Sequence, residues 1–162
     1  MEQPERQQKQ TDEIKALLNA YQQLQKRIDN TEKRKECLEL SMGSPSIPNY
    51  SGMPSGSREN SSKVERDLIK KEELEEKLGD LYAEENSRRE EIEGLIEQMK
   101  KPNEQIVIEM HYIDGVAWRM ISVALYGEEP DYDENEKRYL KRTFKLHGSA
   151  LQSLARIYEK TK

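Results

Sequence analysis

The apolar residues of this chain recur every three or four positions over long stretches, a spacing that is typical of amphipathic helices rather than strands. The first stretch runs from Asp12 to about Ser41, and its stripe consists of Ile14, Leu17, Tyr21, Leu24, Ile28 and Leu38, with Thr31 and Lys35 between them. The second runs from Ser62 to Lys101 and contains Val64, Leu68, Leu74, Leu78, Leu81, Ile92, Leu95, Ile96 and Met99. A helix cannot bury its own stripe, so the pattern predicts an all-α protein in which these helices find partners.

Residues 43–61 separate the two stretches, and twelve of these nineteen residues are Gly, Pro or Ser. This composition predicts a flexible linker, which would let the two helices lie antiparallel as a hairpin or coiled-coil stalk. We therefore expect an N-terminal helix over 1–42 with a frayed start at 1–10, a linker over 43–61, a second stalk helix over 62–87 and a C-terminal domain over 88–162. The apolar seam is thin, and pairing two hairpins would bury more of it, so a homodimer is a candidate arrangement.

The stretch from residue 104 to residue 154 predicts a small helical unit. The apolar positions of its two short helices are Ile106, Met110 and Ile113 in the first and Trp118, Ile121 and Leu125 in the second. Pro102 can open the first of these helices, and Gly115 suits the left-handed residue that closes it. We expect Trp118 to be a core residue. Two short helices across a turn, followed by a longer basic helix, are the arrangement of a helix-turn-helix.

The last predicted helix, from residue 137 to residue 162, has an apolar side and a basic side. The apolar side consists of Leu140, Thr143, Phe144, His147, Leu151 and Leu154, with Ala150 and Tyr158 at its margin. Eight Lys or Arg against one acid balance to +7 here (8 − 1), whereas the other 136 residues balance to −12 (19 − 31). This asymmetry favours contact with DNA phosphates over a plain solvated surface. The candidate DNA-binding residues are Lys137, Arg138, Lys141, Arg142 and Lys145 of this helix and Arg119 of the preceding one.

The segments YIDGVAWRMISVALYG and RTFKLHGSALQSL resemble region 4 of bacterial sigma factors, and the chain resembles phage-encoded regulators of the ArpU/RinA type. The matching positions are Tyr112, Gly115, Trp118, Ile121, Leu146, His147, Gly148, Ala150, Leu151 and Leu154. The Ser-rich SGMPSGS at 51–57 and the following SSKVERDL are similar to the linker of that family. The resemblance implies a sigma-70 region 4-like helix-turn-helix domain behind a helical segment, and control of late phage genes through double-stranded DNA. RNA polymerase is a second partner that it implies.

An acidic insertion departs from this pattern. A turn before a recognition helix usually has three or four residues, whereas about ten intervene here, from Gly127 to Glu136. Asp133 and Glu136 are spaced as a capping pair, and acids near a helix start are favoured by its dipole. The same acids would repel phosphate. The insertion therefore folds aside, or DNA is met further along the helix, or the loop serves a protein partner.

Composition and motifs exclude several other classes. Only 33% of the residues are hydrophobic and 36% are charged, with a net charge of −5, so a single core spanning the chain is not expected. His111 and His147 are the only histidines and Cys37 the only cysteine, without zinc spacing, and no glycine-rich phosphate loop is present. We expect no enzyme activity, no cofactor and no metal. Without an apolar run of membrane length or a signal peptide, we expect a cytoplasmic protein with no membrane contact.

Two alternatives to a transcription regulator stay open. One is a coiled-coil adaptor whose C-terminal domain binds RNA polymerase or another protein. The other is the DNA-recognition subunit of a phage packaging machine. The salt dependence of DNA binding separates the regulator from the adaptor, and the bound sequence, a promoter or a packaging site, separates it from the packaging subunit.

Overall fold

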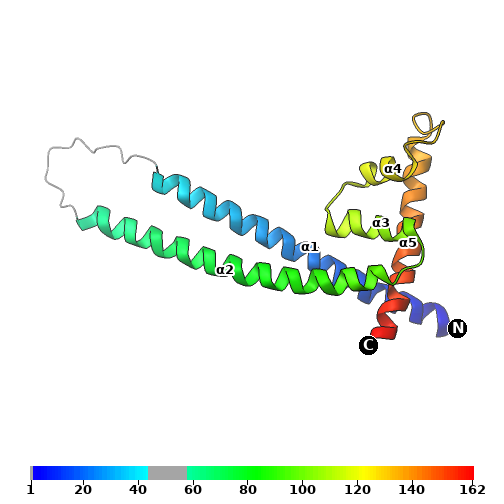
Figure 1. The fold of residues 1–162 in the computed structure, drawn as a ribbon, viewed down its shortest axis with the longest axis horizontal. Coiled ribbons are helices and arrows are strands. Elements are labelled where there is room, and N and C mark those ends of the chain that lie inside the picture. The colour runs from blue at the N-terminus through cyan, green and yellow to red at the C-terminus, as the bar shows by residue number, and fades with distance from the viewer. Residues whose placement is uncertain (1, 44–57) are drawn as a thin grey trace. The chain divides into compact units, whose positions relative to one another are not determined.

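The structure is a computed structural model that describes the backbone of residues 2–43 and 58–162 and the side chains of residues 4–43 and 63–162. All regular structure in these residues is helical, which confirms the all-α prediction for this part of the chain. The elements are α1 (Glu2–Gly43), α2 (Arg58–Glu97), α3 (Pro102–Ile108), the π-helix η1 (Glu109–Ile113), α4 (Trp118–Tyr126) and α5 (Glu136–Thr161) (Figure 1).

The ends of the two long helices differ from the predicted boundaries. Helix α1 is helical from Glu2 onward, where the sequence predicted a frayed start over residues 1–10. Helix α2 begins at Arg58 rather than at Ser62, and Gly43 is the last residue of α1. The rest of the predicted linker, residues 44–57, lies outside the described residues.

The chain divides into two compact units, and both long helices contribute to each. Unit 1 consists of Met1–Gln23 and Asn86–Lys162, and unit 2 of Leu24–Glu85. The apolar pattern predicts a stalk that includes all of the N-terminal helix, but the first half of α1 belongs to the unit that contains α3, α4 and α5. The C-terminal domain is therefore completed by the N-terminal residues of the chain.

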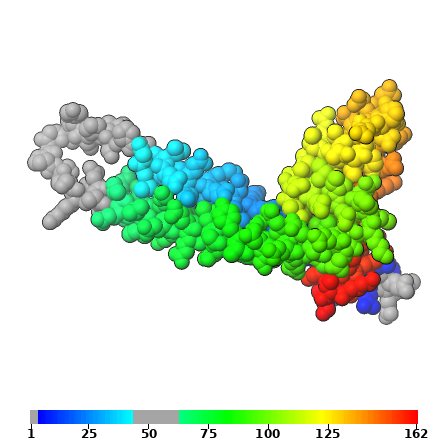
Figure 2. Space-filling view, viewed as in Figure 1, coloured from blue at the N-terminus to red at the C-terminus, as the bar shows by residue number. Residues whose placement is uncertain are grey.

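Unit 2 is a pair of antiparallel helices, which Figure 2 shows side by side in light blue to cyan and in green. The direction follows from two ion pairs, because Lys35 contacts Glu75 at 3.3 Å while Lys71 contacts Glu39 at 3.3 Å, so residue numbers rise along one helix as they fall along the other. The apolar contact is short, with a cluster of Leu24, Ile28, Leu78 and Leu81. Thr31 is also buried, and its hydroxyl donates to the carbonyl of Arg27 at 2.8 Å, which satisfies it within the seam.

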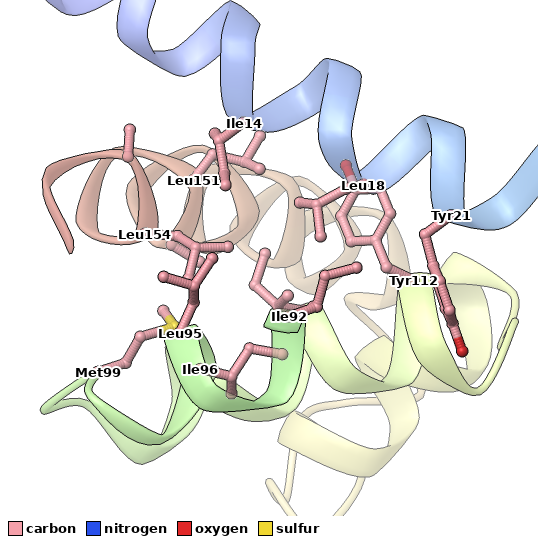
Figure 3. Close-up of a cluster of buried hydrophobic side chains, with 13 residues drawn as sticks. Ile14, Leu18, Tyr21, Ile92, Leu95, Ile96, Met99, Tyr112, Leu151 and Leu154 are labelled. Atoms are coloured by element: carbon pink, nitrogen blue, oxygen red, sulfur yellow. The ribbon is translucent and has the colours of Figure 1, made fainter. Parts of the chain in front are cut away.

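Unit 1 has the larger core, in which α1, the end of α2, α3, η1 and α5 meet (Figure 3). Its buried side chains are Ile14, Leu18, Tyr21, Ile92, Leu95, Ile96, Met99, Ile108, Tyr112, Ala150, Leu151, Leu154 and Ala155. The last turns of α2 face the C-terminal helices, as the sequence indicated. In α1 Leu18 is fully buried together with Ile14 and Tyr21, whereas Leu17, which the sequence placed in the stripe, is only partly buried.

Polar side chains fix the junctions within unit 1. The Gln105 amide donates to the carbonyls of Ile96 and Met99 at 3.0 and 3.1 Å, so it joins α3 to backbone acceptors at and just beyond the end of α2. The Gln22 amide of α1 donates to the carbonyl of His111 at 3.0 Å. These bonds hold α3 and η1 in one arrangement against the long helices.

The turn between the two short helices follows the prediction, but the buried face of the first helix does not. Gly115 has a φ of 67°, the left-handed conformation expected there. Ile106 is 36% exposed, whereas Val107 and Ile108 are fully buried. The buried stripe also contains the carboxylate of Glu104, and this charged residue interrupts the hydrophobic pattern by which the stripe would be found in the sequence. Of the expected face of Ile106, Met110 and Ile113, the prediction is therefore wrong for Ile106, whereas Met110 and Ile113 are half-buried and Ile113 packs against the core.

Candidate nucleic-acid interface

Helix α5 presents its predicted cations to solvent. All five candidate residues of this helix are exposed, namely Lys137, Arg138, Lys141, Arg142 and Lys145. The opposite side is packed against α3 and α4 (Figure 1) and buries Tyr139, Thr143, Ala150, Leu151 and Leu154. The division into two sides that the sequence predicts is present, except that Phe144 is 45% exposed.

Two of the six candidate cations are engaged by carboxylates of the acidic insertion. The guanidinium of Arg138 lies 3.1 Å from Asp131, and that of Arg119 lies 3.6 Å from Glu136. In the described part of the chain no carboxylate forms an ion pair with Lys137, Lys141 or Lys145. These three lysines, four residues apart, form a line about 12 Å long on an α-helix, and they are the centre of the free positive charge.

The acidic insertion folds against α4 and the first turns of α5. Tyr132 is buried and its hydroxyl donates to Ser122 at 3.3 Å. The Tyr139 hydroxyl donates to Asp131 at 2.5 Å, and this bond lowers the pKa of Asp131 and raises that of Tyr139. Of the three alternatives for the insertion, the described contacts match folding aside, at one end of the basic face.

The predicted cap of α5 is wrong. Asn135, and not Asp133, occupies the N-cap position, and its amide donates to the carbonyl of Asp131 at 3.2 Å. The acid that organises the turn is Asp131, since it accepts bonds from Asn135, Arg138 and Tyr139. The three tyrosines that surround the loop are the signal that the sequence offered for this packing; they are Tyr126, Tyr132 and Tyr139.

Arg142 occupies the edge of the basic side. Its guanidinium carbon lies 5.0 Å from the centre of the Tyr126 ring, a cation–π geometry. The contact leaves the residue exposed but restrains its orientation, which lowers the entropy lost when a guanidinium binds a phosphate or a guanine. Arg142 is thus the candidate with the most defined position among those that no insertion carboxylate engages.

Trp118 is half-buried in an aromatic cluster and is not the core residue that the sequence predicted. Its ring stacks on His111 with centroids 4.0 Å apart and meets Phe144 and His147 edge to face at 5.1 and 4.8 Å. The apolar centre of α4 is instead Ile121, which is fully buried. The cluster joins η1, α4 and α5, and its member Phe144 lies at the margin of the basic side.

Both histidines are held neutral near pH 7. Burial lowers the pKa of His147 to about 4, and the neighbouring His111 and Lys15 add to this effect. Burial also lowers the pKa of His111 and raises that of Tyr112. The Tyr112 hydroxyl and the Nε2 atom of His147 share a hydrogen bond of 3.0 Å. His147 therefore packs against Tyr112 and Trp118 on the apolar side of α5, where the sequence placed it.

Glu104 ties α3 to α5. Its side chain is only 2% exposed, and it accepts a hydrogen bond of 2.6 Å from Ser149. Burial disfavours the charge, but the hydrogen bonds from Ser149 and Ser153 and the nearby Lys101 outweigh it, so the pKa of Glu104 is lowered. This buried carboxylate fixes α3 against α5. Its burial was not predictable from the sequence, because a single acid on a charged helix resembles a solvated surface residue.

The first turns of α1 limit the basic side toward the C-terminus. Lys162 contacts Glu13 at 2.6 Å, and Ala155 is buried, although its position on the helix continues the line of the lysines. Leu151 and Gln152 border a hollow with Gln7 of α1. The accessible basic side therefore covers residues 137–145 and does not extend along the whole helix.

Comparison with family models, with curated proteins and with solved structures finds no match. Among the residues that the structure describes, no helix has the length and apolarity needed to cross a membrane. In the same residues no three His, Cys, Asp or Glu side chains gather where they could hold a metal ion.

Proposed function

We propose that this protein is a sequence-specific DNA-binding regulator of transcription that contacts double-stranded DNA through the exposed basic side of α5. The observation that carries the proposal is the line of Lys137, Lys141 and Lys145, which is open to solvent while the opposite side of the same helix is packed. A rigidly packed helix that projects cations is the usual means of engaging the phosphates of a DNA groove. The resemblance to sigma region 4 and to phage late-gene regulators supports the same function.

Within this function the cations have different roles. The lysines act as phosphate contacts, which position the protein without reading the sequence. Arg142 is the candidate for a guanine contact, because its planar guanidinium can donate two parallel bonds and Tyr126 restrains it. Arg119 and Arg138 first have to leave Glu136 and Asp131, so they contribute less to the affinity.

The experiment is a salt titration of duplex DNA binding. Changing Lys137, Lys141 and Lys145 to Gln should weaken binding and reduce the slope of log K against log salt by about 0.9 per lost contact, or about 2.7 for all three. The matched control changes three exposed cations elsewhere in unit 1, Lys100, Arg156 and Lys160, and removes the same charge. Equal slopes for both triple variants would contradict the assignment of the DNA-binding face.

The adaptor alternative is favoured by one observation. Met120 and Val123, one turn apart on α4, are 56% and 40% exposed, and two neighbouring exposed apolar side chains suit contact with a protein partner. In that function the full chain would show no affinity for duplex DNA even at low salt. The titration above therefore separates the two functions.

A further inference from the structure

One flank of the unit 2 hairpin carries a basic groove. Its cations are Lys33 and Arg34 of α1 and Lys70 and Lys77 of α2, with Glu73 as the one acid, a balance of +3 (4 − 1). The floor contains Leu38, Leu74 and the free thiol of Cys37, and the volume of the groove is about 510 Å³. An apolar floor between cations suits an acidic surface that also has apolar side chains.

The other flank carries an acidic groove of nearly the same size, about 500 Å³. Its acids are Glu32, Glu36 and Glu39 of α1 and Glu75 of α2, with Lys35 as the one cation, a balance of −3 (1 − 4). The floor contains Leu78 and Tyr82, and Tyr82 is 42% exposed. The Tyr82 hydroxyl donates to Glu32, so the ring is held at the edge of this groove.

The opposite signs persist when neighbouring ion pairs are included. Lys33 contacts Asp29 at 2.6 Å, which reduces the basic groove to +2 (3 − 1). Lys71 contacts Glu39 and Glu75, which reduces the acidic groove to −2 (−3 + 1). The two grooves thus keep net charges of equal magnitude and opposite sign.

The grooves lie on opposite sides of the apolar seam and at the same height. On an ideal helix Arg34 is turned by about 300° from the buried Thr31, and Glu32 by about 100°. On α2, Lys77 follows the buried Leu74 by three residues and Glu75 follows it by one, so these two side chains are turned from Leu74 by the same two angles. On α1 the basic groove involves residues 33–38 and the acidic groove residues 32–39, so no shift along the hairpin is needed to align them.

We propose that the basic groove of one hairpin receives the acidic groove of a second copy of this chain. The contact would set Tyr82 and Leu78 of one copy against Leu38 and Leu74 of the other, with the cations facing the glutamates. A two-fold axis would bring like charges together, so the interface joins two different surfaces. It leaves one groove free at each end of the assembly, which then grows as a row or closes as a ring. This inference does not depend on DNA binding.

The test uses the full chain and two neutralised variants. The basic-groove variant carries Arg34→Gln, Lys70→Gln and Lys77→Gln, and the acidic-groove variant carries Glu32→Gln and Glu36→Gln. All five side chains are exposed, and Gln preserves their length and helix propensity. A matched control, Glu72→Gln with Glu76→Gln, removes two acids from the exposed outer side of α2. Circular dichroism checks that each variant keeps the helix content of the parent.

Sedimentation at tens of micromolar gives the result. At about 0.01 M salt, where the Debye length is about 30 Å, the parent and the control should exceed the mass of two chains, and at about 1 M salt they should be monomers. Each groove variant alone should be a monomer at both salt concentrations. An equal mixture of the two should stop at the mass of two chains, because only one acidic and one basic groove remain.

Three results would overturn the proposal. A parent chain that is monomeric at low salt has no such contact. Groove variants that stay associated on their own assemble through another surface. A basic-groove variant with unchanged mass but a lower affinity for duplex DNA would assign the groove to phosphate instead. Loss of DNA binding by the lysine variants of α5 has no bearing on these masses, so the two proposals fail separately.

Discussion

Units 1 and 2 share the two long helices α1 and α2, but they are stabilised in different ways. Unit 1 buries thirteen side chains in one apolar cluster, whereas the cluster of unit 2 contains four. Unit 2 adds ion pairs between partly exposed side chains, such as Lys35 with Glu75 and Lys71 with Glu39. Because exposed ion pairs contribute little, unit 1, which contains α5 and its cations, is the more stable unit, and the hairpin is only marginally stable.

The largest expected difference between the units comes from deleting a core leucine. Leu154→Ala in unit 1 should lower the free energy of unfolding by about 3–5 kcal/mol, because many neighbours surround a site with no exposure. Leu78→Ala in unit 2 should lower it by about 1–2 kcal/mol, since the thin seam can collapse around the gap. Hydrogen exchange would report both effects by segment.

The segment pattern of that exchange distinguishes this structure from an independent stalk. Because Ile14 and Leu18 pack in the core of unit 1, Leu154→Ala should also remove protection from the first half of α1. Retained protection there would show that the N-terminal helix folds without the C-terminal domain.

A smaller loss is expected at Trp118. Its half-buried ring contacts His111, Phe144 and His147, so Trp118→Ala should lower the free energy of unfolding by about 2–3 kcal/mol, below the cost of a fully buried Trp. Trp118→Phe, the matched control, keeps much of the ring contact. Urea titration followed by circular dichroism measures both. A loss as large as that of Leu154→Ala would mean that Trp118 is a central core residue after all.

Acid should weaken unit 1 and spare unit 2. The folded pKa of His147 is about 4, below its ordinary value of 6.5, so the unfolded chain binds more protons between these values. The contribution of His147 to the stability of unit 1 is therefore complete above pH 6.5 and is lost as the pH falls toward 4. Both histidines of the chain, His111 and His147, belong to unit 1, so the hairpin lacks this contribution.

Exchange protection at pH 7 and pH 5 would measure the acid effect by segment. His147→Gln should reduce the loss in unit 1 and leave the share of His111, whose pKa is also lowered. Equal losses in the residues of both units would contradict the role of the histidines.

The smallest expected effect is at the ion pairs of the hairpin. Glu75→Gln removes contacts with Lys35 and Lys71 at 3.3 and 4.0 Å, and it should lower the stability of unit 2 by about 0.2–1 kcal/mol at low salt and by less at high salt. Glu72→Gln serves as the control, because this residue lies on the outer side of α2. A loss above that of Leu78→Ala would reverse the ranking of apolar and ionic contributions.

Local chemistry made part of the fold predictable. Pro102 opens α3 because its missing N–H is not needed there, and Gly115 takes the left-handed φ that other residues avoid. The exposed cations of α5 followed from helix periodicity alone. Each of these features depends only on residues that are neighbours in the chain, so it can be predicted from the sequence.

The missed features depend on residues far apart in the chain. The sequence does not show that Ile14 and Leu18 meet Leu151 and Leu154, since either stripe could be covered by the other long helix. The buried Glu104 is satisfied by Ser149, which is 45 residues away. A contact between residues only eight positions apart was also missed, because the bond between Tyr139 and Asp131 packs a loop that its charges suggest is solvated. The hydrogen-bond partners of these polar groups determine the geometry of the site, and hydrophobic periodicity does not predict them.

Cleavage of duplex DNA by an iron chelate attached to one cysteine tests most directly whether the basic side of α5 lies on DNA. Cys37 is the natural thiol and is exposed, so Cys37→Ser provides the background for Lys141→Cys, with Glu93→Cys on the exposed side of α2 as the control position in unit 1. A chelate at position 141 should cut the bound duplex at a confined site, and one at position 93 should leave it intact. Binding without cleavage from position 141, or equal cleavage from both positions, would contradict the DNA-binding face.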